Sequence, residues 1–316
     1  MACYTNKKSR SGSYTDRSKH SYVGLDAVMH PLPEWKEYEL AVRDELAASL
    51  PDATVLADVR LPGIRSQTER QIDVLIEERL SGHLVRTAVD AKLYSRPLDV
   101  KDVEDFIGML GDIEVERGLL VTKTGYTKAA MARAFADSVD LDLDILSLEE
   151  FKQWQGRAAL PFSGPHVVAL FAPFGWAIDA RTVPQSYLAR LYRRGLSAKQ
   201  AEDRWEWMYL NIWTRHHPVN SLDALIAQQS AYLLSASSNR AIITQREVDL
   251  RVSERTVVRR AEMPQYRTAE ITGFVEFRDF ICFVVLFTPL HLERRNTRKL
   301  EYLLRKMTPG TVVKPT

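Results

Sequence analysis

From Pro33 onward the chain shows a helical pattern of apolar positions. Apolar side chains recur every three or four residues over about 34–50, which predicts an amphipathic helix. Pro33 stands at its start, where the missing N–H of proline costs nothing. The apolar stripe comprises Trp35, Tyr38, Val42 and Leu46. Strand-like segments rich in β-branched residues follow at Thr54–Arg60, Gln71–Glu77 and Leu84–Lys92.

Helical and strand-like patterns alternate in the next segment. Asp99 is a typical N-cap for a helix with apolar positions at Val100, Val103, Phe106, Ile107 and Leu110. After it come a buried strand at Gly118–Thr122, an alanine-rich helix at Thr127–Asp137, a strand at Leu141–Leu146 and a short helix capped by Ser147. The order α-β-β-β-α-β-α-β-α predicts an α/β fold with a mixed sheet flanked by helices.

A domain boundary is expected at Gly156–Pro165, where glycine and proline accumulate. Beyond it, Pro184–Trp213 has the pattern of two helices broken at Gly195, and Ser197 with Gln200 forms a capping box for the second. Its apolar face would comprise Ala201, Trp205, Met208, Tyr209 and Ile212. We therefore expect residues 158–316 to form an α-rich α+β domain.

Two features of this second half admit more than one interpretation. Val252–Arg260 resembles the turn and recognition helix of a helix-turn-helix, although Glu247 would then occupy a position that needs a small buried residue. The other interpretation is an exposed basic helix. The aromatic residues Trp205, Trp207, Tyr209 and Trp213 could stack on bases, but helical spacing favours core packing.

Composition favours a soluble globular protein, with 45% hydrophobic and 27% charged residues. The two cysteines, Cys3 and Cys282, offer neither a disulfide framework nor a zinc-ligand spacing. The longest apolar runs, at Val167–Ile178 and Phe280–Leu290, are shorter than the roughly 20 residues of a membrane-spanning helix. They predict buried core elements and no membrane association. The polar N-terminus shows no signal peptide, so a cytoplasmic location is expected.

Charge is placed unevenly, although the formal net charge is only +2. Residues 1–30 lack periodicity and are predicted to form a flexible basic arm. A second basic group lies near the C-terminus and comprises Arg294, Arg295, Arg298, Lys299, Arg305 and Lys306. Such groups attract phosphate, but they are also typical of ordinary solvated surfaces.

The candidate chemistry lies in the hairpin formed by the second and third strand-like segments. If its turn is centred between Ser81 and Gly82, Asp73 is opposite Asp90 and Gln71 is opposite Lys92. Opposed residues have Cβ atoms roughly 5 Å apart. Like charges at that distance repel each other, and a divalent cation between them would reverse the effect.

Glu39 is a further candidate, because it lies on the apolar stripe of the first helix. A carboxylate among apolar neighbours is costly unless it has a cation or a hydrogen-bond partner. Three carboxylates and a lysine directed at one place would suit metal-assisted phosphodiester hydrolysis.

The stretch from Tyr38 to Ala134 resembles the Mrr-like restriction endonucleases of the PD-(D/E)xK nuclease superfamily. The matching pieces, in order, are YE at Tyr38–Glu39, ERQIDVLI at Glu69–Ile76, VDAK at Val89–Lys92, VKDVEDFIGML at Val100–Leu110, GLLVT at Gly118–Thr122 and GYTKAAMARA at Gly125–Ala134. Ile72 stands where the superfamily name has proline. The resemblance implies a restriction-endonuclease-like αβββαβ core, Mg²⁺ dependence (with Mn²⁺ as a substitute) and DNA cleavage.

The resemblance also implies roles for individual residues. Asp73 and Asp90 would be direct metal ligands, together with the backbone carbonyl of Ala91. Lys92 would orient or help to deprotonate the attacking water. Glu39 would hold a metal-bound water or a second ion. Gln71 is a candidate from its facing position alone.

Taken together, the sequence predicts a nuclease domain at 31–157 and a recognition, sensing or partner-binding domain at 158–316. The expected activity is metal-dependent endonucleolytic cleavage of DNA, in restriction or phage defence. Its partners would be DNA, a second copy in a homodimer, or a regulatory protein. The alternatives are a nuclease fold that binds DNA or a partner without chemistry, and a structure-specific resolvase or RNase.

Overall fold

A computed structural model describes residues 31–80, 83–115, 117–136, 142–153, 156–215, 217–266 and 268–312. The predicted basic arm at 1–30 and the turn at Ser81–Gly82 lie outside these ranges. The chain divides into two units, Met1–Pro33 and Glu34–Thr316, and all helices and strands lie in the second among the described residues. None of its described helices has the length and apolar character that a membrane span requires.

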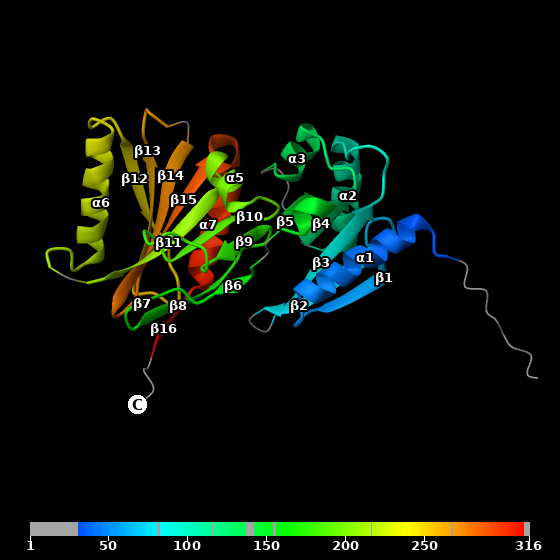
Figure 1. Cartoon of the computed structure of the whole chain (residues 1–316), viewed down its shortest axis with the longest axis horizontal. Helices are drawn as coiled ribbons and strands as arrows, with labels where there is room; N and C mark the ends of the chain where they lie inside the picture. Colours follow the sequence, from blue (N-terminus) through cyan, green and yellow to red (C-terminus); the bar gives the residue numbers. More distant parts are fainter. Residues whose placement is uncertain are drawn as a thin grey trace, which may run out of the picture. The chain divides into compact units, whose positions relative to one another are not determined.

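The first half of this unit contains a five-stranded sheet in the order β1-β2-β3-β4-β5 (Figure 1). Strands β1, β2 and β3 pair antiparallel, whereas β3, β4 and β5 pair parallel. The bounds of the strands are β1 Thr54–Pro62, β2 Glu69–Leu80, β3 His83–Lys92, β4 Arg117–Thr122 and β5 Asp142–Ser147. The predicted mixed sheet is therefore confirmed.

Helices cover both faces of this sheet. Helix α1 (Glu34–Ser49) packs Tyr38, Val42 and Leu46 against one face. Helices α2 (Val100–Ile113) and α3 (Lys128–Ala134) pack against the other, and α4 (Leu148–Phe151) follows β5. The predicted burial of Trp35 is wrong, because its side chain is 52% exposed.

The predicted capping residues begin these helices. Asp99 accepts hydrogen bonds from the backbone N–H groups of Lys101 and Asp102, and Asp102 completes a capping box. Ser147 forms a capping box with Glu150 at the start of α4. A side chain that satisfies the free N–H groups at a helix start typically contributes about 1 kcal/mol of stability. Because only a few residue types can do so, they mark helix starts in the sequence.

The second half is mostly antiparallel β-sheet, so the prediction of an α-rich domain is wrong. Its main sheet has seven strands in the order β12-β13-β14-β15-β11-β10-β9. Their bounds are β9 Trp176–Asp179, β10 Ala189–Arg193, β11 Trp207–Thr214, β12 Ile242–Glu247, β13 Arg255–Glu262, β14 Thr268–Glu276 and β15 Phe280–Pro289. A smaller sheet contains β6 Ala158–Ala159, β7 Phe162–Ser163, β8 His166–Phe171 and β16 Thr308–Thr311.

Two long helices pack on opposite faces of the seven-stranded sheet (Figure 1). Helix α6 (Leu222–Ala236) buries Leu225 and Ile226 against residues of β13, β14 and β15. Helix α7 (Glu293–Lys306), which follows the 3₁₀ turn η1 (Leu290–Leu292), buries Leu300 and Leu304 on the other side. The apolar runs that the sequence assigned to the core form β8, β9 and β15, as predicted.

The two helices predicted within 184–213 are largely strands. The capping box of Ser197 and Gln200 is present, but its helix α5 (Ala198–Asp203) ends before the aromatic residues. Along β11, Met208 and Leu210 are buried and alternate with more exposed neighbours, which is the two-residue period of a strand. The aromatic and β-branched content of this segment outweighs its helical spacing because hydrogen bonds to β10 and β15 are available.

Both interpretations of Val252–Arg260, the helix-turn-helix and the exposed basic helix, are wrong, because Arg255–Glu262 forms strand β13 between β12 and β14. Arg259 is buried there, with 1% of its side chain exposed, and it pairs with Glu270. The basic residues of α7 also differ in burial, because they lie on different sides of the helix. Arg295 and Lys299 are buried, whereas Arg294 and Arg298 are exposed.

Gly118 in β4 allows α2 to approach the sheet closely, and this gives a stability prediction. An added Cβ would lie 2.7 Å from the ring of Phe106 and closer still to Leu110. Gly118→Ala should therefore reduce the free energy of unfolding by about 1–3 kcal/mol in urea denaturation, because the core must shift to admit a methyl group.

Gly108→Ala is the matched control on the exposed side of α2, where a Cβ would meet no atom within 4 Å. There the better helix propensity of alanine should leave stability unchanged or raise it by up to about 1 kcal/mol. Equal effects of the two substitutions would contradict the packing argument.

Candidate active site

The pairing of β2 with β3 has the predicted register as far as Val74, which faces Val89. The backbone ladder extends from this pair toward the hairpin end. On the other side of the pair, the Asp73 carboxylate accepts a hydrogen bond of 2.8 Å from the backbone N–H of Ala91. The Asp73 side chain thus occupies the position of a backbone acceptor and is brought against β3, beside Asp90.

Asp90 and Lys92 form an ion pair on β3, with Lys92 Nζ 2.8 Å from Asp90 Oδ2. Both side chains are partly buried, with 14% of Asp90 and 27% of Lys92 exposed. Burial lowers the pKa of Lys92, but the carboxylate of Asp90 outweighs that effect, so the pKa lies above its ordinary value. Lys92 is therefore a charged donor at neutral pH. Its ammonium group also lies 5.8 Å from the ring centre of Tyr94.

Asp73 is the most perturbed carboxyl group of this cluster. Burial, followed by the charge of Asp90 and a hydrogen bond shared with it, raises the pKa of Asp73 to about 7. The hydrogen bond from Ala91 and the charge of Lys92 act in the opposite direction. A carboxyl group whose pKa is raised beside a second carboxylate marks a place where a cation would be stabilised.

Glu39 faces the same region from α1. It is buried, as predicted, with 8% exposure. Burial raises its pKa, the hydrogen bond from Lys36 lowers it, and the charge of Asp73 raises it. Lys36 Nζ lies 2.9 Å from Glu39 Oε2, so the buried carboxylate has a cationic partner within its own helix.

The Gln71 side chain bonds to β1. It donates a 2.6 Å hydrogen bond to Asp58 on that strand, and the residue is exposed. Asp58 also lies 3.5 Å from Lys36 Nζ. Gln71, Asp58 and Lys36 thus form a polar rim beside Glu39.

Asp58 and Lys36 were missed by the sequence reasoning. Asp58 has a φ of 56°, which is rare for a residue other than glycine, and it interrupts the pairing of β1 with β2. The connection between these strands is not a tight turn, so their register could not be read from the sequence. An acidic residue within a strand was the only signal, and many strands carry one.

The donor set fits a hard divalent cation. Asp73 and Asp90 offer carboxylate oxygens, and such ions prefer oxygen ligands. Within the described ranges, no three acidic, histidine or cysteine side chains are gathered closely enough to form a complete metal cage. A site with two carboxylates suits Mg²⁺, because this ion usually retains several waters and takes one or two carboxylates from the protein.

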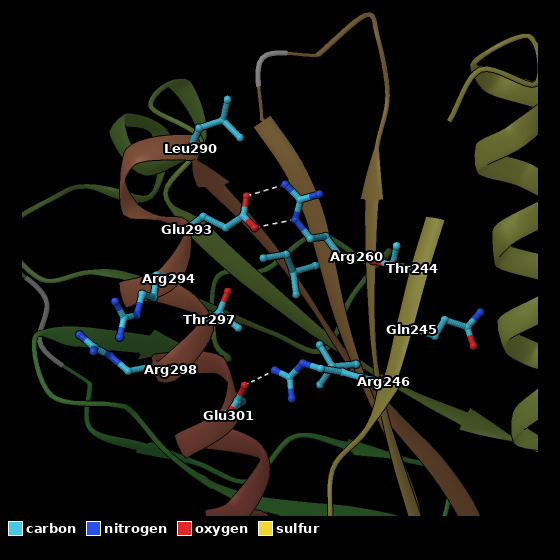
Figure 2. Close-up of a pocket in the computed structure, with 12 residues that line it drawn as sticks. Thr244, Gln245, Arg246, Arg260, Leu290, Glu293, Arg294, Thr297, Arg298 and Glu301 are labelled. Carbon is cyan, nitrogen blue, oxygen red and sulfur yellow. Dashed lines mark hydrogen bonds and ion pairs between the residues drawn. The ribbon is translucent and has the colours of Figure 1, made fainter. Parts of the chain in front are cut away.

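A separate cavity of about 860 Å³ lies between α7 and strands β12 to β14. Figure 2 shows two of its four arginines paired with glutamates: Arg260 with Glu293, and Arg246 with Glu301. The other two arginines of the lining, Arg294 and Arg298, are exposed, so basic side chains outnumber acidic ones in this cavity.

Comparison with known proteins classifies the first half of the chain. Residues 35–154 match the family model Mrr_cat, which is described as a restriction endonuclease. This match agrees with the sequence resemblance to the Mrr-like restriction endonucleases. The match spans less than half of the 316 residues and does not classify the second half.

Other comparisons are uninformative about function. No curated protein matches the sequence. The solution structure of PsbP from Synechocystis sp. PCC 6803 is similar at 11% identity and a TM-score of 0.31, covering 45% of this chain and 85% of that one. A mutant of the protein Mog1 is similar at 12% identity and a TM-score of 0.31, covering 49% of this chain and 95% of that one. Similarity at this level supports no functional argument.

The shifted pKa of Asp73 predicts how the metal-free protein responds to pH. A folded pKa of about 7, above the ordinary 3.8, stabilises the fold fully below about pH 4, and this contribution is lost as pH rises through 7. The melting temperature in EDTA should therefore fall more between pH 5 and pH 8 in the wild type than in Asp73→Asn.

The exposed residue Asp44 on α1 offers the control substitution Asp44→Asn, which should leave the wild-type pH profile intact. If Asp73→Asn and wild-type protein show parallel melting profiles, Asp73 does not hold a shifted proton.

Proposed function

We propose that this protein is a metal-dependent endonuclease that hydrolyses phosphodiester bonds in DNA. The observation that carries the proposal is the cluster of Asp73, Asp90 and Lys92 at the end of the β2–β3 ladder. It lies within the segment that matches the restriction endonuclease family. In that context, an opposed carboxylate pair with an adjacent ammonium group is suited to hold a divalent cation next to a phosphate.

Each residue of the cluster has a distinct role in the proposed mechanism. Asp73 and Asp90 would hold the cation, with Mn²⁺ as a substitute for Mg²⁺, and the carbonyl of Ala91 would supply a further oxygen. When bound, the cation supplies Lewis acidity to the phosphate and lowers the pKa of the attacking water. Asp73 gives up its shared proton as the cation binds, because the added positive charge then compensates both carboxylates.

Lys92 and Glu39 would act on the attacking water and on the charge of the phosphate. Lys92 remains protonated and donates from Nζ toward a phosphate oxygen or the attacking water, offsetting the charge that develops there. Glu39 accepts a hydrogen bond from that water or helps to hold a second ion. Its pKa lies above the ordinary value because it is buried, which makes it a better proton acceptor than an exposed glutamate.

The second half of the chain is proposed to direct the nuclease rather than to add chemistry. Strand β6 already pairs with β8, which supports a boundary near residue 157. The restriction or defence setting, homodimer formation, and control by a partner protein or signal belong to this proposal. Plasmid, modified phage DNA, single-stranded DNA and RNA, each with Mg²⁺, Mn²⁺ or EDTA, would separate it from a resolvase or an RNase.

Asp90→Asn and Lys92→Ala should each abolish cleavage, with turnover reduced at least about 100-fold, because each removes a ligand or a charge donor in the transition state. Initial rates on plasmid DNA with Mg²⁺ measure the effect. Lys199→Ala is the matched control, since Lys199 forms an exposed pair with Asp203 on α5. Wild-type rates in Asp90→Asn would refute the assignment and favour a nuclease fold without chemistry.

Glu39→Gln should lower turnover by roughly 10- to 100-fold, because the amide cannot accept a proton. The melting temperature should change little, since the amide oxygen can still accept the hydrogen bond from Lys36. Glu37→Gln on the exposed side of α1 is the control and should retain full activity. Full Mg²⁺-dependent turnover in Glu39→Gln would remove this residue from the site.

A further inference from the structure

An aromatic groove lies in the second half of the chain, between α6 and the seven-stranded sheet. Two adjoining cavities of about 530 and 670 Å³ share Tyr187, Trp207, Tyr232 and Phe287. We call their combined space the aromatic groove. Each of the two cavities has a volume within the range of sites that bind small organic molecules.

Aromatic rings form most of the groove wall. Trp207 lies 5.1 Å from Phe287 and 5.7 Å from Tyr209, measured between ring centres. Trp205 lies 5.5 Å from both Tyr266 and Phe287. Because the rings contact one another at these separations, a planar ligand would stack on their outward faces rather than between them.

Several of these rings remain exposed, at a cost in free energy. Tyr232 on α6 is 74% exposed, Tyr266 is 46% exposed and Trp205 is 38% exposed. Trp205 also adopts a φ of 57°, the left-handed conformation that ends α5, with the N–H of Glu206 bonded to the carbonyl of Ala201.

Polar groups line the same groove and distinguish it from a site for a purely apolar ligand. Asn211 and Gln228 offer amide groups, and Glu270 pairs with Arg259 at 2.8 Å. Arg259 is 1% exposed, and its Nε has no hydrogen-bond partner among the described residues. An unsatisfied donor buried in this way is costly and is commonly satisfied by a ligand or a water.

From this combination we infer that the aromatic groove binds a nucleobase, either in a free nucleotide or extruded from DNA. A nucleobase is flat, has two π faces and carries donors and acceptors along its edge. The rings would stack on its faces, and the amides with the Arg259–Glu270 pair would bond to its edge. This site goes beyond the proposed nuclease activity, because it lies in another domain and needs no metal.

The charges of the groove favour a nucleobase over an organic cation. Glu270 is neutralised by Arg259, and Glu202 lies 3.6 Å from Arg190. An aromatic cage for a quaternary ammonium group would gain from a free carboxylate, whereas an uncharged base needs only paired donors and acceptors. An acyl chain would leave the polar groups without partners.

Binding can be measured on the full-length protein in EDTA, so that cleavage does not enter the result. Calorimetry with dAMP, dGMP, dCMP and dTMP tests free nucleotides. Fluorescence anisotropy with matched and single-mismatch duplexes tests extruded bases, because a mismatched base costs less to unstack. We expect a nucleotide to bind, or the mismatched duplex to bind more tightly than the matched one. The first result identifies a free nucleotide as the source, and the second identifies DNA.

Tyr232→Ala and Trp205→Ala should each weaken this binding, or reduce the mismatch preference, roughly tenfold. Phe162→Ala is the control, because Phe162 is 62% exposed on β7 and lies outside the groove. Tyr232 is so exposed that its removal should leave the melting temperature unchanged. The affinity for the matched duplex should also stay constant, since its contacts lie with the nuclease domain.

The inference is overturned if no nucleotide binds and the two duplexes bind equally. It is also overturned if the groove substitutions change neither the nucleotide affinity nor the preference for the mismatched duplex. Binding of choline in place of nucleotides would assign the groove to organic cations. A change in oligomeric state with Tyr232→Ala, seen in sedimentation without any effect on nucleotides, would assign it to a second copy of the chain. If the wild-type protein binds nucleotides but does not cleave DNA in the presence of Mg²⁺, only the nuclease proposal is refuted.

Discussion

The close approach of the Asp73 and Asp90 carboxyl groups is the constraint on which the candidate active site depends. Two like charges at this separation oppose folding unless a proton or a cation compensates one of them. Without metal a proton does so, and burial together with the charge of Asp90 raises the pKa of Asp73 to about 7. The β2–β3 ladder and the bond from Ala91 to Asp73 hold the pair in place. Strand pairing thus stabilises an arrangement that electrostatics alone would separate.

A second set of charges links the two halves of the described unit. Asp144 on β5 is completely buried and accepts hydrogen bonds of 2.8 and 3.0 Å from Arg194, which follows β10. Lys299 on α7 bonds to Asp142 at the start of β5. Leu292 adds an apolar contact to the core beneath α2 and α3. Separating these elements would leave buried charges without partners, so the five-stranded sheet and the second half of the chain depend on each other energetically.

The two proposed sites use different physical chemistry. At the end of β3, carboxylates and an ammonium group provide strong directional fields suited to a metal ion and a phosphate. In the aromatic groove the charges are paired, and ring faces and amide groups dominate, which suits a flat uncharged ligand. A nuclease built in this way would keep its chemistry on a rigid sheet and its selectivity on a separate surface.

The sequence by itself determined the mixed sheet, the helix starts and the register that brings Asp73 beside Asp90. These features rest on local signals: β-branched alternation, capping side chains and a short hairpin connection. Only the tertiary structure decided the second half. There the aromatic segment at Trp207–Thr214 has both helical and strand-like spacing, and pairing with β10 and β15 selected the strand. Asp58 lies beside the site because β1 pairs with β2, and Lys36 lies there because α1 packs on the sheet. No local sequence pattern encodes long-range contacts of that kind.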